Sequence, residues 1–257
     1  MAYNFLIIGE ACTDQFVYGK ISRLSPEAPV PIFNPVRTES NDGMAKNTFN
    51  NLLAIIRREN KNHSVNGIFS ENCSTKIRYV DNKTNHYFLR VDFEDEYDRI
   101  DFNNDVRQKI AEADCIIISD YNKGFLEAED IEAIYKLKAI STPIFIDTKK
   151  KLDSSIIDWV DFIKLNQKEY EENVEDSIKK SLSEKLIVTL GEIGAFYNDK
   201  TFRSYSPKNT IDVSGAGDTF TAALAYRYME DKSIESSIPF ANEVAGEVVT
   251  KRGVCTI

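Results

Sequence analysis

The chain has 257 residues, 42% of them hydrophobic and 11% aromatic, so we expect a globular protein with a real core and exclude a disordered chain. The formal net charge of −9 argues against nucleic acid or an anionic membrane as the main partner, because both need a basic surface, although a small phosphorylated ligand needs only local positive charge. Without a signal peptide, a membrane-length apolar run or a CxxC pair among its four cysteines, the chain is expected to be cytoplasmic with free thiols.

Short apolar runs alternate with longer amphipathic stretches along the chain. We read the runs as strands of a sheet covered on both faces, since each is continuously apolar. They lie at 5–9, 115–120, 143–147, 162–166 and 185–190. Helices are expected at 45–60, 103–113, 127–140, 167–182, 219–230 and 234–251. This alternation predicts an α/β fold with a doubly wound, mainly parallel sheet.

Two segments break the alternation. The prolines of 28–36 suit an edge strand, and 75–94 alternates polar and apolar residues around the turn DNKTN, which is typical of a hairpin. We expect these segments to form a small β-layer at one end of the main sheet.

Polar residues follow several predicted strands where those strands end. In an open α/β sheet, ligands bind beyond the carboxyl ends of the strands. The positions are Asp14, Asp120, Asp147, Asn166, Glu169, Thr189, Gly191 and Asp218. Any one of them alone is compatible with a helix cap, but their gathering along one rim favours a ligand site.

The stretch IDVSGAGDTF is the most informative motif. The amides of Gly215, Ala216 and Gly217, at the start of a helix, can form an anion hole for a phosphate or a transferring phosphoryl group. Asp218 can accept a proton from an attacking hydroxyl, although a helix N-terminus should lower its basicity. The alternative is a glycine-rich turn with Asp218 as its N-cap. The chain contains neither GxxxxGK[ST] nor GxGxxG, so it has no Walker A loop or dinucleotide fingerprint.

DVSGAGDTF resembles the signature of the PfkB/ribokinase family of ATP-dependent carbohydrate kinases. GKISRLSPEAPVPIF, STKIRYV, FLRVDFED, ISDYNKGFL, FIDTKK, LNQKEYE and ANEVAGEVVTKRGVCTI are similar, in order, to the D-glycero-β-D-manno-heptose-7-phosphate kinase branch, the kinase half of a bifunctional ADP-heptose synthesis protein. The resemblance implies a single ribokinase-like domain over 1–257, with lid strands within 15–37 and 75–94. The lid would also form a homodimer surface.

The resemblance implies ATP and Mg²⁺ as cofactors, and Asp218 as the catalytic base beside the anion hole. Asn166 and Glu169 match the NxxE motif, which organises Mg²⁺ and phosphates through water. The nucleotide-site turn and the adenine pocket are matched by Thr189, Gly191, Gly194 and Asn242.

Two further ligand sites follow from the resemblance. Asp212 and Ser214 match the loop that binds a monovalent cation, such as K⁺, in many members. Sugar-binding positions are matched by Asp14, Gly43 and Asn47. We expect local positive charge for a sugar phosphate from Lys76, Arg78, Arg90 and Lys123.

The chain departs from the family pattern in several places. The sugar motif reads GMAKN, so we expect the Met44 side chain to stand where bare backbone usually approaches the sugar. The stretch before STKIR is short, which predicts the loss of a strand–helix unit from one sheet edge. The usual final helix and the HxGH motif of a nucleotidyltransferase are absent. The lysines of 149–151 are expected to begin a solvated helix.

The leading hypothesis is therefore an ATP-dependent sugar kinase, a phosphotransferase with an alcohol acceptor. A heptose-7-phosphate-like substrate comes first, and a fructose- or ribose-like sugar second. A non-catalytic sugar or nucleotide sensor on a degenerate kinase scaffold is the alternative from another class. A structural dimerisation module is a third interpretation, and it predicts no nucleotide binding.

Overall fold

The computed structural model describes residues 1–93, 97–204, 210–251, 253 and 255–257. In this part of the chain an eight-stranded sheet has the strand order β12-β11-β10-β9-β8-β7-β1-β4. Its strands are β1 (Asn4–Gly9), β4 (Ser64–Phe69), β7 (Cys115–Asp120), β8 (Ile144–Thr148), β9 (Phe162–Asn166), β10 (Leu186–Thr189), β11 (Gly194–Tyr197) and β12 (Lys200–Arg203). The strands from β4 to β10 are parallel, and β11 and β12 add an antiparallel hairpin. The expected mainly parallel sheet is confirmed.

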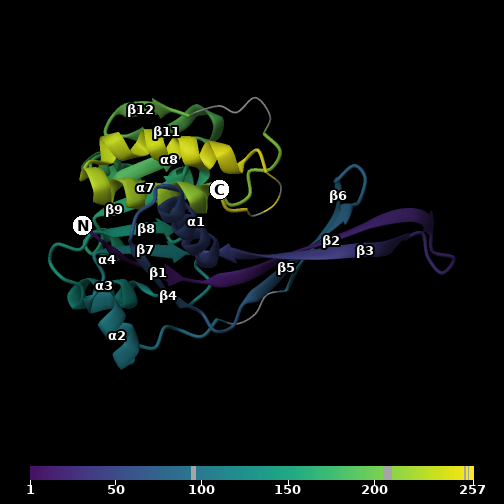
Figure 1. Cartoon of the computed structure of the whole chain (residues 1–257), viewed down its shortest axis with the longest axis horizontal. Coiled ribbons are helices and arrows are strands. Elements are labelled where there is room, and N and C mark those ends of the chain that lie inside the picture. Colours follow the sequence, from purple (N-terminus) through teal and green to yellow (C-terminus); the bar gives the residue numbers. More distant parts are fainter. Residues whose placement is uncertain (94–96, 205–209, 252, 254) are drawn as a thin grey trace.

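Helices cover both faces of this sheet (Figure 1). They are α1 (Ala45–Arg58), α2 (Asn104–Ala111), α3 (Ala128–Leu137), α4 (Ser154–Ile157), α5 (Gln167–Asn173), α6 (Asp176–Lys179), α7 (Ala216–Asp231) and α8 (Ile234–Val248), with the short 3₁₀ turns η1 (Lys180–Leu182) and η2 (Gly191–Ile193). The helix expected over 167–182 is broken, because Val174 leaves helical geometry and turns into the core.

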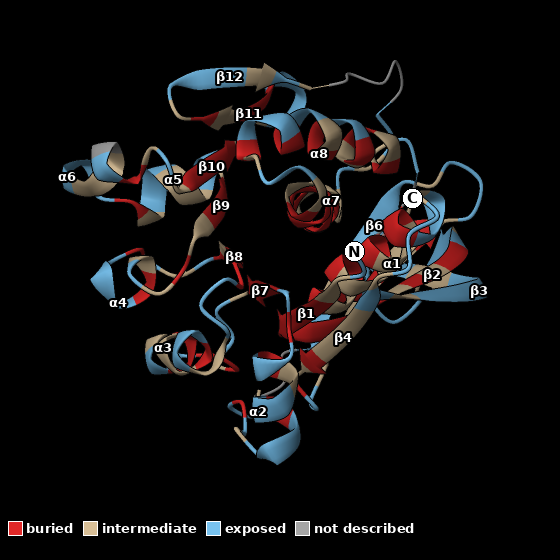
Figure 2. Ribbon diagram, turned by 60° about the vertical axis from the view of Figure 1, so that its left-hand side comes forward, coloured by how far each residue is buried: buried red, intermediate tan, exposed pale blue. Residues whose placement is uncertain are grey.

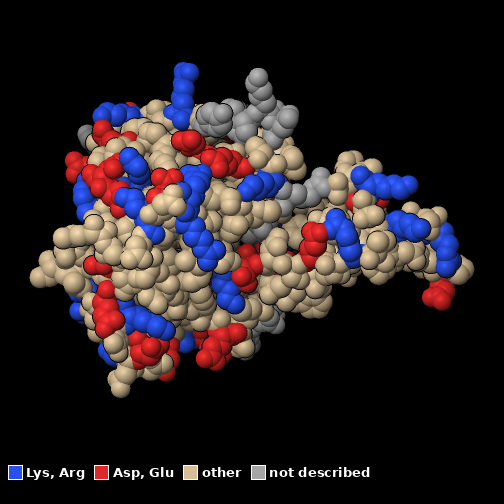
Figure 3. Space-filling view, viewed as in Figure 1, with Lys and Arg blue, Asp and Glu red and all other residues tan. Residues whose placement is uncertain are grey.

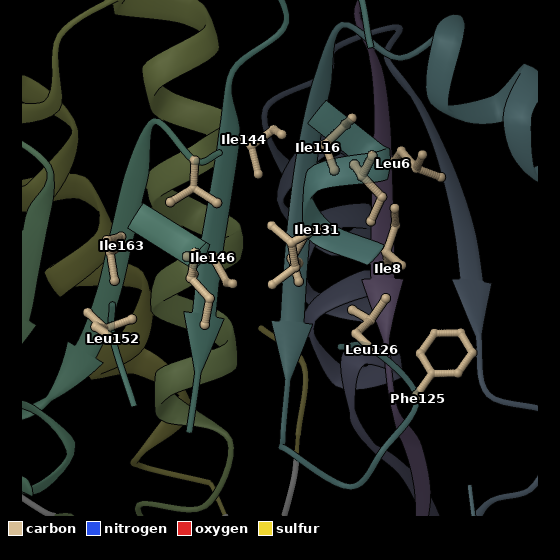
Figure 4. Packing of buried hydrophobic residues seen from close by; sticks show 14 of the residues in the cluster. Leu6, Ile8, Ile116, Phe125, Leu126, Ile131, Ile144, Ile146, Leu152 and Ile163 are labelled. Carbon is tan, nitrogen blue, oxygen red and sulfur yellow. The ribbon is translucent and has the colours of Figure 1, made fainter. Parts of the chain in front are cut away.

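Successive residues of the central strands point to opposite faces and so build two cores. Phe5 and Ile7 pack with α1, α7 and α8, and Figure 2 shows α7 as a largely buried helix. Leu6 and Ile8 point the other way and pack in the cluster that holds Ile131 of α3 (Figure 4). Burial on both faces explains why these strands are continuous apolar runs.

The second sheet is four-stranded, with the order β3-β2-β5-β6. Its strands are β2 (Ala11–Leu24), β3 (Pro31–Met44), β5 (Ser74–Asp81) and β6 (Tyr87–Phe93), and we call it the small sheet. Figure 1 shows it projecting from the main body as an arm. The hairpin expected over 75–94 is present as far as residue 93, and residue 94 lies outside the described residues. The proline-rich segment expected over 28–36 lies in the edge strand β3 from Pro31 onward, while residues 28–30 precede the strand.

The four cysteines are free thiols, as expected. Over the described residues, every helix is too short or too polar to cross a lipid bilayer.

Candidate active site

The glycine-rich motif lies at the N-terminus of α7, beyond the carboxyl ends of the parallel strands. Gly215 precedes the helix with φ 80° and ψ −3°, a left-handed conformation that glycine adopts without strain. Asp218 lies in the first turn and is 5% exposed. The N-cap position belongs to Gly215, so the alternative interpretation of Asp218 as the N-cap is wrong.

The carboxylate of Asp218 accepts two side-chain hydrogen bonds. The Tyr121 hydroxyl donates to Oδ1 at 2.7 Å, and Asn47 Nδ2 donates to Oδ2 at 2.8 Å. Burial raises the pKa of Asp218 to about 6 and the Asp147 charge adds to this effect, while both hydrogen bonds and Lys164 oppose it. Asp218 is therefore more basic than an ordinary carboxylate, and not less basic as its place at a helix N-terminus led us to expect. A carboxylate with this pKa suits a general base near neutral pH.

A buried ion pair lies beneath the glycine-rich turn. Lys164 Nζ donates to Asp147 Oδ2 at 2.8 Å, and Thr221 Oγ1 donates to the same carboxylate oxygen at 3.2 Å. Although burial opposes it, the Asp147 carboxylate raises the pKa of Lys164, so the ammonium stays charged. A Cβ on Gly217 would lie 2.9 Å from this Nζ, so glycine brings the turn close to a positive charge. Lys164 was not among the expected site residues, although a lysine within a strand expected to be buried on both faces indicates a buried charge with a partner.

The expected sugar-binding positions meet where the small sheet joins α1. Asp14 is 3% exposed and pairs with Arg78, and Cys12 Sγ donates to its Oδ2 at 3.6 Å. A Cβ on Gly43 would lie 2.2 Å from that same oxygen, so Asp14 can occupy this place only beside glycine. Asn47, one turn along α1, connects this corner to Asp218.

Met44 is buried rather than placed in a cleft. Its side chain is 4% exposed, with Sδ 4.0 Å from the Tyr97 hydroxyl. Its backbone, at φ 57° and ψ −135°, is strained for a residue with a side chain.

The candidate phosphate-binding cations differ in their surroundings. Arg78 is 8% exposed and faces Asp14. Arg90 lies opposite Arg78 in the β5–β6 pairing, but its guanidinium makes a bidentate ion pair with Asp92, at 2.7 Å for each hydrogen bond. Lys123 is exposed. Figure 3 shows acidic and basic side chains intermixed over this face of the molecule.

A cavity of about 410 Å³ lies on the other side of the glycine-rich turn. It is lined by the expected nucleotide-site residues Thr189, Gly191, Gly194 and Asn242, by Ala216 and Gly217 of the turn, and by apolar residues of α7 and α8 such as Phe220 and Ala245. Gly194 has φ 118°, and a Cβ there would lie 2.0 Å from the Phe202 carbonyl oxygen. The Asn242 amide donates to that carbonyl at 3.0 Å, so it ties α8 to β12.

Asn166 and Glu169 form a capping box at the start of α5. Glu169 Oε2 accepts from the Asn166 amide nitrogen at 2.8 Å, and Asn166 Oδ1 accepts from the Glu169 amide nitrogen at 2.9 Å. Within the described residues, no group of three or more His, Cys, Asp or Glu side chains could hold a metal ion. One half-buried carboxylate at the rim still fits Mg²⁺, which keeps several waters and commonly takes only one or two protein carboxylates besides substrate phosphates.

The loop before the glycine-rich turn is braced by Asp212. Its carboxylate accepts from the Ser214 amide at 2.9 Å, the Gly253 amide at 3.0 Å and the Tyr87 hydroxyl at 3.0 Å. Burial opposes ionisation, but these donors hold the pKa of Asp212 below its usual value. An ionised carboxylate and loop oxygens are the ligand types that a hard monovalent cation requires.

The lysines of 149–151 do not begin a helix, so that expectation is wrong. The Lys149 Nζ lies 4.2 Å from the centroid of the Tyr121 ring, and Lys150 pairs with Asp120 at 3.0 Å. The next helix begins at Ser154. Lys151 pairs instead with Glu175 at 2.9 Å.

Comparison with known proteins gives matches along the whole chain. A family model described as pfkB family carbohydrate kinase matches residues 55–257. The bifunctional protein HldE of a Nitratiruptor species is 31% identical over 298 positions, which cover 100% of this chain and 63% of that protein. HldE of Helicobacter pylori is 31% identical, and the alignment covers 97% of this chain and 63% of that protein. The chain thus spans less than two thirds of these relatives.

Solved structures share the fold. Ribokinase of Arabidopsis thaliana, complexed with ribose and ATP, superposes with a TM-score of 0.68 at 16% identity, over 98% of this chain and 94% of that one. Phosphofructokinase-2 of Escherichia coli, in complex with potassium, superposes with a TM-score of 0.68 at 13% identity, over 100% of this chain and 96% of that one. The expected ribokinase-like fold is confirmed.

Proposed function

Because the chain belongs to the pfkB family of carbohydrate kinases, we propose that it transfers the γ-phosphoryl group of Mg·ATP to a hydroxyl of a sugar or sugar phosphate. One observation carries this proposal. Asp218 is buried in the first turn of α7, with the sugar-binding positions on one side and the 410 Å³ cavity on the other.

Asp218 is the general base in this proposal. Its ionised carboxylate takes the proton of the acceptor hydroxyl as the oxygen attacks phosphorus, and ADP leaves with the bridging oxygen. Asn47 Nδ2, bonded to Oδ2, orients the carboxylate. Phosphoryl transfer through a loose transition state depends chiefly on positioning and electrostatics, so a base with a pKa of about 6 is sufficient.

The turn of Gly215, Ala216 and Gly217 binds the migrating phosphoryl group. Its amides lie at the N-terminus of a 16-residue helix, where the dipole favours negative charge. The Lys164 ammonium beside Gly217 adds a fixed positive charge. In a buried site both contributions are stronger than in water.

The nucleotide occupies the cavity lined by Thr189, Gly191, Gly194 and Asn242. Asn166 and Glu169 would hold Mg²⁺, and Asp212 and Ser214 would form the K⁺ loop. The charge that Mg²⁺ would supply there is positive and would offset the negative charge of the nucleotide phosphates.

For the acceptor, we propose a heptose-7-phosphate-like sugar phosphate, as the match to HldE along the whole chain suggests. Arg78 beside Asp14 is the cation best placed for its phosphate. A free fructose- or ribose-like sugar is the second candidate, favoured by the ion pairs that engage Arg78 with Asp14 and Arg90 with Asp92.

A panel of free and phosphorylated heptoses, hexoses and pentoses, assayed for ADP release with Mg·ATP, tests the proposal. We expect turnover with at least one sugar phosphate and weaker turnover with its dephosphorylated form. Thermal stabilisation by Mg·ATP without turnover on any sugar would instead support the non-catalytic sensor. Neither stabilisation nor turnover would support the structural dimerisation module.

We further propose that the small sheet is a lid over the sugar and a homodimer surface, in a cytoplasmic enzyme that folds as one domain. Phe33, Tyr79 and Phe88 form an aromatic cluster on it, with ring centroids 5.2 and 5.9 Å apart for Phe33–Tyr79 and Phe33–Phe88. Phe88 is 40% exposed and Leu89 57% exposed. An uncovered apolar cluster of this kind marks an interaction surface.

A further inference from the structure

Tyr121 contacts the proposed base directly, and its side chain comes from a different element. It follows β7, at the carboxyl end of the sheet, and its hydroxyl donates to Asp218 Oδ1 at 2.7 Å. The other oxygen of the carboxylate is bonded to Asn47. A carboxylate held at both oxygens has a fixed rotation about its side-chain bonds, which a catalytic base requires.

The turn that carries Tyr121 is fixed by a fully buried carboxylate. Glu10 is 0% exposed, and its two oxygens accept from the backbone amides of Tyr121, at 2.8 Å, and Lys123, at 3.0 Å. Burial and the Asp120 charge raise the pKa of Glu10, so an ionised carboxylate at this position costs free energy that its hydrogen bonds must offset. Both of its oxygens bind amides of this turn, so Glu10 fixes the backbone position of Tyr121.

The Tyr121 ring is held as firmly as its backbone. Lys149 Nζ lies 4.2 Å from the ring centroid, and Lys76 Nζ, from β5 of the small sheet, lies 5.9 Å from it. Both are cation–π contacts. Desolvation and the Asp218 charge raise the pKa of the Tyr121 hydroxyl well above 10, so it remains a hydrogen-bond donor at neutral pH.

We propose that Tyr121 is a positioning residue for the reaction, whose hydroxyl orients Asp218 and favours its ionised form. This inference rests on the proposed function, since it assumes that Asp218 is the base. A hydrogen bond donated to a carboxylate stabilises the anion, and here it works against burial. The charged groups that face Asp218 are Asp147 of β8, Lys164 of β9, and Lys149, which directly follows β8.

Tyr121→Phe tests the inference through the pH dependence of kcat/KM. Removal of the hydroxyl should raise the pH midpoint of the acidic limb by about one unit, because a hydrogen bond to a charged group is worth roughly that much. A fall in kcat should accompany the shift. Tyr197→Phe is the matched control, since its hydroxyl donates one hydrogen bond, to the Glu184 carbonyl at 3.0 Å, away from Asp218.

A second measurement does not depend on turnover. The ¹³C-carboxyl resonance of Asp218, assigned by its loss in Asp218→Asn, should titrate at higher pH in Tyr121→Phe than in wild type. Equal midpoints for Tyr121→Phe and wild type, by rate or by resonance, would overturn the inference and leave the kinase proposal intact. A raised resonance midpoint in a protein that turns over no sugar would support the role of Tyr121 on Asp218 and overturn the kinase proposal.

Discussion

At the scale of single residues, the behaviour of the site is set by how its charges are buried. Asp218 is an acid whose burial dominates its surroundings, so its pKa lies at about 6 rather than below 4. Lys164 is equally buried but keeps its charge, because Asp147 accompanies it. The proposed active site therefore combines a carboxylate that titrates near neutrality with a permanent positive charge.

A pH dependence follows from the raised pKa of Asp218. The base must be ionised, so kcat/KM should rise with pH through about 6 and level off above it, falling about tenfold for each unit below. Steady-state rates between pH 5 and 9, with Mg·ATP saturating, measure this profile. A rate that stays constant down to pH 5 would show that no group with this pKa acts as the base.

The sequence could predict the residues of this site only where a motif names them. Asp218 and the turn before it stand together in the chain, so they were predictable. Glu10 follows β1, Tyr121 follows β7 and Lys164 lies in β9, so only the order of these strands in the sheet brings the three residues together. For Lys164 alone the local sequence gave an indication, because a lysine within an apolar strand is unusual.

At the scale of elements, strands with two covered faces were easy to predict, whereas β4, β11 and β12, near the two edges of the main sheet, were not. β7 is a continuous apolar run because helices pack on both of its sides. β4, at the sheet edge, is half polar, and β11 and β12 are only four residues each, so periodicity gave them no clear signal. Their turn at Asn198 and Asp199, both with positive φ, is typical of a hairpin and was a usable sign.

The small sheet carries the prediction that belongs to this scale. Leu89→Asp places a charge in the proposed dimer surface and should convert a dimer to a monomer, because a buried unpaired charge is costly. Light scattering after size exclusion measures the mass. Ile140→Asp is the control, since Ile140 is fully exposed on the main body. A dimer that survives Leu89→Asp, or a wild-type monomer, would contradict a homodimer through this sheet.

At the scale of the whole molecule, the two sheets contribute different parts of the proposed active site. The main sheet and α7 bring the cavity and the glycine-rich turn together, while the small sheet brings Asp14 and Arg78 to the same corner. Tyr87 of β6 also donates to Asp212 at 3.0 Å, which joins the far hairpin of the small sheet to the loop before α7. The ends of both sheets thus converge on Asp218.

The replacement Asp218→Asn tests the central claim most directly, because it keeps the shape of the side chain and removes the base. With a sugar that wild type phosphorylates, kcat should fall by at least roughly 10²-fold, while Mg·ATP still binds in the adjoining cavity and raises the melting temperature as it does for wild type. Turnover at the wild-type rate in Asp218→Asn would contradict the account.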